Sequence, residues 1–432
     1  MESQEKIKLK REIGVLGLAA NTVNLIIGAG IFVLPALVAG YLAEASILAY
    51  IVCGFLMFTI VLCFAEIGSQ ITTTGGAYAY IQAAFGPFWG FIANSLFWFG
   101  TGVLMNAAVV NAMADMLAVR FELLQLPIYR AIFFFLLFGI FALVNVRGVK
   151  YGNRMVTINT LVKLIPIFLL ITFGWMAVSA ENLEWKHFPT LESIGGGSLM
   201  LFFAFGGGEA ALSVSGEIKQ PQKTIPYGIL LGISAVILIY ILIQVVSQGV
   251  LGNELVAQKN APLAAVAGSI FGEFGSTLII AGGVISIFGS LSGSILSYPR
   301  VLYGGALNGW LPSFMAKIHP RFATPYWAII VYAILDFVFA ISGGFKQLAI
   351  ISSSALLIIY LGVVLAVIKF RINNLSDTKP TFRLPFGLTI PIIAAISILW
   401  FLTNLAAKEF IGLGIFVVIL SLIYWVLQRQ KK

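Results

Sequence analysis

Long apolar segments dominate this sequence of 432 residues. A helix needs about 20 mostly apolar residues to cross the hydrocarbon core of a bilayer, and twelve segments meet that requirement. Between them lie short loops, which leave no room for a catalytic or nucleic-acid-binding domain. The sequence therefore predicts an all-α polytopic membrane protein with 12 transmembrane helices, at 13–41, 45–68, 87–118, 130–147, 152–178, 193–216, 226–251, 274–304, 325–343, 346–369, 384–405 and 410–428.

The charges of the loops predict the orientation of these helices. With the N-terminus in the cytoplasm, eighteen lysines and arginines fall on the inner side and six on the outer side. Such an asymmetry is typical of proteins inserted by the positive-inside rule. We expect a multi-pass protein of the cell membrane, with both termini and loop 69–86 cytoplasmic and loop 180–192 external. The net charge of +9 is then explained by topology and by the lipid bilayer as partner, without a nucleic acid.

Few residues in this chain are suited to catalysis or metal binding. Cys53 and Cys63 both fall in the second apolar segment, and His187 and His319 fall in loops on opposite sides of the membrane. This distribution offers no disulfide framework and no zinc site. We expect no enzyme activity, no metal and no cofactor.

Two of the apolar segments are interrupted by glycines near their centres. The first contains Gly28-Ala29-Gly30, and the sixth contains the run Phe203 to Gly208. Each glycine inside a helix costs about 1 kcal/mol relative to alanine, and freed backbone groups are tolerated in the membrane only inside protein or along a cavity. The pattern indicates two broken helices, although glycines also form packing faces between helices.

The two interruptions occupy corresponding positions in the two halves of the chain. Each half holds five segments, and because five is odd the second half enters the membrane inverted. Paired breaks in inverted halves are typical of the binding site of a secondary transporter. The predicted organisation is a cytoplasmic tail (1–12), a first repeat (13–178), a second repeat (193–370), two further helices (384–428) and a cytoplasmic tail (429–432).

The broken ends suggest which ligand the site binds. A half-helix that begins at Ile31 presents free N–H groups and a positive dipole end, which suit a carboxylate. Half-helices that end near Ile27 and Ala204 present carbonyl groups, which suit an ammonium. One site that holds both groups close together fits the backbone of an α-amino acid.

The charged residues inside the apolar segments include Lys163, Glu209, Asp115 and Asp336. Lys163 lies about 16 Å into the fifth segment at 1.5 Å per residue, near the midplane, where a lysine is expensive and is expected to have a partner or a role in proton transfer. The alternatives for Lys163 are a structural ion pair or snorkelling. Glu209 either caps the second half of the sixth segment or acts as a gating or proton-linked acid. Asp115 and Asp336 either pair with a neighbour or face water near a helix end.

The motifs taken together resemble the amino acid–polyamine–organocation (APC) family. This resemblance extends over essentially the whole chain in order and implies a LeuT-type fold of two inverted five-helix repeats plus two helices. It also implies amino acid transport by alternating access. The motifs that carry it are Gly28 to Pro35, Phe203 to Glu209, Gly216 to Pro226, Ala261-Pro262-Leu263 and Pro299 to Pro312.

The resemblance also implies roles for individual residues. Phe203 matches an aromatic gate, and Lys163 matches a lysine whose ammonium occupies the place of a sodium ion, with Ser290 close to it. The implied substrate-binding residues are Ile27, Gly28, Ala29, Gly30, Ile31, Phe203, Ala204, Phe205, Gly206, Gly207 and Gly208, and the coupling residues are Lys163, Glu209 and Ser290.

The chain departs from the family pattern at three positions. Arginine–agmatine antiporters carry a tryptophan where this chain has Ser294, and neutral amino acid exchangers carry one where it has Gly208. Glu209 resembles an acid of several bacterial members, some of which take basic substrates. We therefore predict a transporter of amino acids, most simply neutral ones, with proton coupling or exchange. The alternative is an antiporter of cationic amino acids or polyamines; a channel or an intramembrane enzyme fits the polar residues poorly. The sequence leaves the oligomeric state open.

Overall fold

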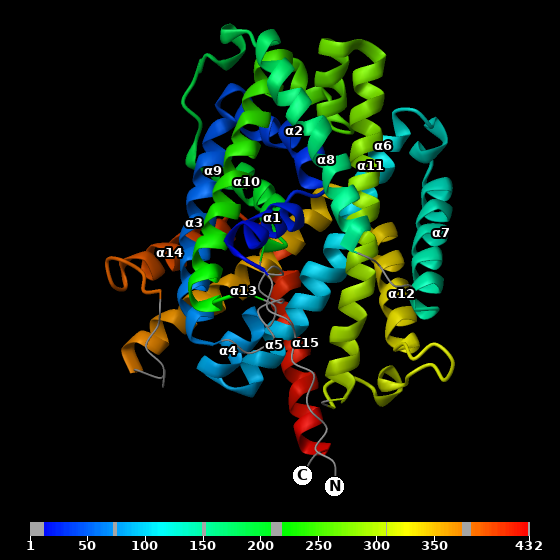
Figure 1. Ribbon diagram of the computed structural model, residues 1–432, viewed down its shortest axis with the longest axis vertical. Coiled ribbons are helices and arrows are strands. Elements are labelled where there is room, and N and C mark those ends of the chain that lie inside the picture. The colour runs from blue at the N-terminus through cyan, green and yellow to red at the C-terminus, as the bar shows by residue number, and fades with distance from the viewer. Residues whose placement is uncertain are drawn as a thin grey trace.

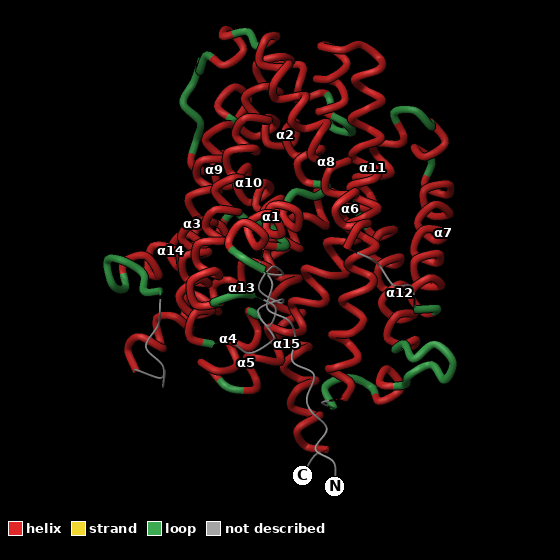
Figure 2. Tube along the Cα trace, viewed as in Figure 1, coloured by secondary structure: helices red, strands yellow, loops and turns green. Residues whose placement is uncertain are grey.

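The computed structural model describes residues 13–71, 76–148, 153–208, 218–307, 309–373 and 382–430. In these ranges the chain is helical, without strands and with one isolated bridge between Ile13 and Ile218 (Figure 2). The helices are α1 (Val15–Ile26), α2 (Gly30–Leu42), α3 (Ile47–Gln70), α4 (Ala77–Phe85), α5 (Pro87–Leu96), α6 (Met105–Ala118), α7 (Pro127–Val146), α8 (Asn153–Gly174), α9 (Leu191–Phe202), α10 (Pro221–Leu251), α11 (Pro262–Leu307), α12 (Tyr326–Ser342), α13 (Phe345–Asn373), α14 (Thr389–Thr403) and α15 (Ala407–Gln430).

The helix lengths confirm a polytopic membrane protein. Seven described helices are long and apolar enough to cross a membrane alone, and α1 with α2 forms an eighth candidate that is bent by 58°. Shorter apolar helices occur at Lys163–Ala177, Leu191–Phe205, Tyr326–Ser342 and Thr389–Thr403. Helix therefore lies in each of the twelve predicted segments, while the count of twelve crossings and the inverted repeat stay predictions.

The helices lie side by side in a bundle with α1 near its middle (Figure 1). On the outside, α7 and α15 present large apolar side chains to their surroundings, including Phe135, Ile140, Ile415 and Val418. Only 6% of the most apolar window of α15 is buried within the protein. Exposed apolar surface of this extent requires a lipid environment.

Two glycines of α10 form the groove in which α1 lies. A Cβ on Gly228 would come within 2.8 Å of the side chain of Leu18, and one on Gly232 within 2.7 Å of Thr22. The spacing of four residues places both glycines on one face of α10 and allows the two backbones to approach closely. Beyond the groove, the N–H of Lys219 donates to the carbonyl of Ile13 (2.9 Å).

A buried ion pair joins α3 to the end of α13. The Nε of Arg371 donates to Oε1 of Glu66 (2.6 Å), and the backbone N–H of Leu384 donates to Oε2 of the same carboxylate (2.7 Å). The side chains of Arg371 and Glu66 are 9% and 2% exposed. Because the carboxylate has both a cation and a backbone donor, its charge is compensated within the protein.

Candidate functional site

The first apolar segment is broken at the predicted glycines. α1 ends at Ile26, and the N–H of Ile27 closes its last turn by donating to the carbonyl of Val23 (2.9 Å). α2 begins at Gly30 in a new direction, bent by 58° from α1. The last carbonyls of α1 and the first N–H groups of α2 thus have no partners within their own helices.

The second break follows α9 directly. One 3₁₀ turn, Phe203–Phe205, continues the helix, and Gly206 then adopts an extended conformation. Gly207 has a φ of +101°, and a Cβ on it would lie 2.9 Å from the carbonyl oxygen of Leu25. Only glycine satisfies both conditions at this position. Glu209 lies outside the described residues, so its predicted role stays a prediction.

The two breaks are in direct contact. A Cβ on Gly30 would lie 2.8 Å from the Cβ and 3.0 Å from the Cα of Ala204, and a Cβ on Gly208 would lie 3.0 Å from Ile26. Two sets of glycines that are far apart in the sequence therefore meet at one point. Most residues of the two predicted sets are buried, while Gly28, Gly207 and Gly208 stay partly exposed.

Lys163 of α8 reaches the first break. Its side chain is buried, and its Nζ donates to the carbonyl oxygen of Ile27 (2.8 Å) and also to that of Asn24. No carboxylate pairs with Lys163 among the described residues. The alternative that Lys163 forms a structural ion pair therefore has no support in this part of the chain. The carbonyls of Asn24 and Ile27 were expected to suit a ligand ammonium, but an ammonium of the protein itself binds them.

Tyr240 of α10 bridges the two breaks, although it belongs to none of the sequence motifs. Its Oη lies 2.8 Å from the carbonyl oxygen of Ala204 and 3.2 Å from that of Ile26. The ring is buried against Phe205. One hydroxyl thus lies within hydrogen-bonding distance of a carbonyl group from each broken helix. The chain has 14 tyrosines, and no motif distinguishes this one.

Replacing Tyr240 with phenylalanine is expected to lower the free energy of unfolding by about 1–3 kcal/mol, the cost of leaving buried acceptors without a donor. The thermal midpoint of the purified protein in detergent measures the change. Tyr424→Phe is the matched control, because this ring packs on Phe88 and Phe91 and no hydrogen bond of its hydroxyl is found among the described residues. Equal midpoints for both variants would contradict a bridging role.

Ser290 of α11 lies beside the first break. Its Oγ is 3.8 Å from the position that a Cβ on Gly28 would occupy, and the side chain is exposed. The resemblance implied that Ser290 lies close to Lys163, yet within the described residues no hydrogen bond joins the two. Ser290 is thus placed to touch a ligand at Gly28 more directly than to hold the lysine.

Two further residues fix the second break in place. The ring of Phe203 packs edge-on against Phe345 of α13, with centroids 5.3 Å apart. The Cε of Met105 on α6 lies 2.6 Å from the position of a Cβ on Gly206. Phe203 is buried in this arrangement, and its role as a gate stays a prediction. Met105 was not identified from the sequence, because nothing in the local sequence distinguishes one apolar residue from the others in an apolar helix.

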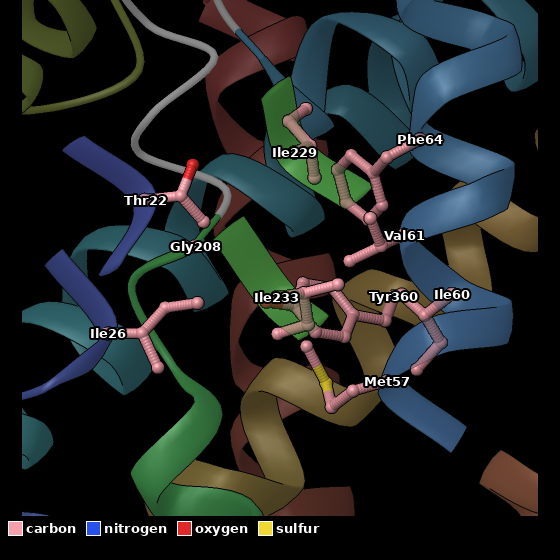
Figure 3. Close-up of a pocket in the computed structure, with 10 residues that line it drawn as sticks. All are labelled: Thr22, Ile26, Met57, Ile60, Val61, Phe64, Gly208, Ile229, Ile233 and Tyr360. Carbon is pink, nitrogen blue, oxygen red and sulfur yellow. The ribbon is translucent and has the colours of Figure 1, made fainter. Parts of the chain in front are cut away.

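A small apolar cavity opens beside Gly208 (Figure 3). The hydroxyl of Thr22 donates to the carbonyl of Leu18 in its own helix (2.9 Å), so it leaves the walls apolar. A bulky side chain in place of Gly208 would meet Ile26 on this side. The walls come from α1, α3, α10 and α13, with the residues Thr22, Ile26, Met57, Ile60, Val61, Phe64, Ile229, Ile233 and Tyr360.

Comparison with known proteins gives one family for the whole chain. The family model described as "Amino acid permease" matches residues 13–427. The serine/threonine exchanger SteT of Bacillus subtilis is 30% identical over 396 residues, which are 89% of each chain. From the same organism, the methylthioribose transporter is 26% identical over 100% of this chain and 96% of its own. The branched-chain amino acid permease BcaP is 24% identical over 98% and 94%.

Proposed function

The chain belongs to the amino acid permease family, and on this premise we propose that it moves neutral amino acids across the cell membrane as a secondary active transporter. The substrate binds where the two helix breaks meet, and the protein alternates between two membrane faces with proton coupling or exchange. The contact between Gly30 and Ala204 is the observation that carries this proposal, because it brings the interrupted ends of two helices to one point.

The carboxylate of the substrate binds at the start of α2. This helix has 13 residues, and its first N–H groups and dipole favour an anion. Gly28 and Gly30 carry no side chain to block the approach. The ammonium lies toward the backbone of Ala204 to Gly207, because Lys163 occupies two of the carbonyls of α1.

The surroundings of the site support a neutral substrate. Among the described residues the charged side chain at the breaks is Lys163, and its ammonium disfavours a cationic ligand nearby. The cavity beside Gly208 is apolar. Two of the relatives named above are called a serine/threonine exchanger and a branched-chain amino acid permease, which fits the same substrate class.

Purified protein in liposomes tests the proposal. Uptake of labelled amino acids is measured with and without a pH gradient, and with and without unlabelled amino acid inside. Serine, threonine and branched-chain amino acids are expected to be transported. Their decarboxylated amines should compete about 10- to 100-fold more weakly, because they lose hydrogen bonds to a charged group worth about 1.5–3 kcal/mol.

Two results would contradict the proposal. Competition by agmatine or a polyamine as strong as that of the amino acids would favour the cationic antiporter. Uptake of methylthioribose without uptake of any amino acid would assign the site to another substrate class. Stimulation by internal amino acid indicates exchange, and accumulation driven by an inward proton gradient indicates symport.

A further inference from the structure

Asp336 is a buried carboxyl group that the proposed transport mechanism leaves unused. It lies near the middle of α12 and is 0% exposed. From the sequence, Asp336 was expected to pair with a neighbour or to face water, but the structure shows no cation beside it among the described residues and no exposure. Its Oδ2 accepts a hydrogen bond from Nδ2 of Asn106 on α6 (3.1 Å), while its Oδ1 has no partner among the described residues.

The charged groups of the surrounding helices are engaged elsewhere. Helices α6, α7 and α11, the π-helical stretch Phe97–Leu104 and the 3₁₀ turn Ser313–Ala316 pack against α12. The last two contain no charged residue. Asp115 of α6 pairs with Arg130 of α7, Glu273 of α11 pairs with Arg120, and Arg300 of α11 is exposed. The titratable group that interacts with Asp336 is the phenol of Tyr332, which in turn interacts with the phenol of Tyr298.

The contrast with Glu66 shows what this environment means for Asp336. Both carboxyl groups are buried, but Glu66 has Arg371 and a backbone N–H, whereas Asp336 has one neutral amide. An ionised carboxylate without a cation is strongly disfavoured in an apolar interior, and the group takes up a proton instead. A protonated carboxyl also places a hydrogen on one of its two oxygens.

A polar network connects Asp336 to the wall of the substrate site. Asn106 also donates to Oη of Tyr332 (3.2 Å), whose ring stacks on Tyr298 of α11 with centroids 5.9 Å apart. Tyr298 donates to the carbonyl of Thr101 (3.1 Å) in the π-helical stretch. Such stretches are frequent at functional sites.

Two members of this network, Asn106 and Tyr298, belong to helices that also reach the breaks. Met105, which contacts the second break, directly precedes Asn106. Tyr298 follows Ser290, which lies beside the first break, by about two turns of α11. The side chain of Tyr298 is partly exposed, so the network extends from the buried carboxyl to a residue at the protein surface.

We propose that Asp336 is a proton-binding site, separate from Lys163, that is loaded in this conformation and acts on transport through Asn106, Tyr332 and Tyr298. Loss of the proton places an unpaired charge between α6 and α12 and disturbs both walls of the substrate site. The transport consequence rests on the proposed function, whereas proton binding itself is measured without any substrate.

Infrared spectroscopy of the purified protein tests proton binding directly. The chain contains three aspartates, Asp115, Asp336 and Asp377, so labelling with ¹³C-aspartate shifts the carboxyl band of any protonated aspartate. We expect a protonated aspartate at pH 7 in the wild type and in the Asp115→Asn/Asp377→Asn variant, where Asp336 is the only aspartate left. A wild-type spectrum without a ¹³C-sensitive protonated band at pH 7 would overturn the proposal, whether or not any Asp336 variant folds.

The Asp336→Asn variant supplies a second measurement. The folded state holds a proton that the unfolded chain releases near the ordinary pKa of an aspartate, about 3.9. The wild type therefore loses stability as pH rises. The equilibrium constant for unfolding increases by up to roughly tenfold per pH unit. Asp336→Asn is expected to lose this slope and the infrared band, and Asp115→Asn to keep both. Identical slopes for the wild type and Asp336→Asn would refute the proposal.

Transport completes the test. At equal pH on both sides of the membrane, exchange by the wild type is expected to fall at alkaline pH, and Asp336→Asn, which mimics the protonated form, to retain its rate. If no variant transports any amino acid, the proposed function fails while the infrared result still decides proton binding. If transport by Asp336→Asn keeps the wild-type pH profile, the link between Asp336 and transport is wrong.

Discussion

Gly28→Leu is expected to abolish amino acid binding, with a loss of at least about 100-fold in affinity, while the protein still folds. A Cβ at this position would meet no atom closer than Ser290 Oγ, at 3.8 Å, so the fold has room for a side chain. In the proposed mechanism that room is where the substrate carboxylate binds. A branched side chain would fill it and remove the charge-assisted hydrogen bonds, worth about 1.5–3 kcal/mol each, together with the steric access to α2.

Comparison of Gly30→Leu with Gly28→Leu distinguishes a blocked binding site from a damaged fold. Here the added Cβ would lie 3.0 Å from the Cα of Ala204, and backbone cannot yield as a side chain can. We expect this variant to lose binding and also stability, by about 1–3 kcal/mol for overpacking. Gly304→Ala is the control, because no atom lies within 4 Å of its Cβ. Binding measured by isothermal calorimetry and thermal midpoints distinguishes the three variants.

If Gly28→Leu bound amino acids with the wild-type affinity, the carboxylate would not lie at the start of α2. The proposed site would then have to be moved away from the first break, even if transport itself were confirmed.

Lys163→Ala is expected to remove uptake driven by a pH gradient while exchange of amino acids persists. In the wild type the buried ammonium holds the carbonyls of Asn24 and Ile27 and so fixes the end of α1. Release of its proton removes the positive charge that strengthens both hydrogen bonds. A difference in protonation between the two conformations is what couples a gradient to the cycle. Lys163→Arg should not restore coupling, because a guanidinium does not deprotonate in proteins.

Uptake into liposomes at several imposed pH differences measures this effect. Lys346→Ala is the control, since this lysine is exposed and its Nζ lies over the ring of Tyr41, 4.8 Å from the centroid. A Lys163→Ala protein whose uptake keeps the wild-type dependence on the pH difference would show that the lysine is structural. Lower stability of Lys163→Ala does not distinguish a coupling role from a structural role, because two buried carbonyl groups lose their donor in both cases.

The broken helices were predictable because their signal is local. Gly28, Gly30 and Gly206 to Gly208 interrupt apolar runs that otherwise favour helix, and no distant contact is needed to recognise them. The depth of Lys163 could likewise be counted along its own helix. That it contacts α1 rather than another neighbour is a property of helix packing, which one sequence does not specify.

The contacts that hold the site together were not predictable. Tyr240, Met105 and Asn106 are placed by the register between helices far apart in the sequence, and each looks ordinary in its own segment. The pair Gly228 and Gly232 is a partial exception, because a four-residue glycine spacing in an apolar helix is a known packing pattern. It predicts a close neighbour without saying that this neighbour is α1.

Helix α1 is hydrogen-bonded to other helices mainly at its C-terminal end, so a small rotation at the break displaces its N-terminal end by a larger distance. Among the described residues, its hydrogen bonds from side chains of other helices come from Lys163 and Tyr240 and lie in its last turn and the break. The opposite end is joined to the chain before α10 by one backbone hydrogen bond at Ile13. The 12 residues between span about 18 Å, so a rotation of about 20° at the break moves the far end by about 6 Å. In the proposed transport cycle, a proton or a ligand that shifts the break by a fraction of an ångström would therefore move the far end of α1 by several ångströms and could open or close a passage there.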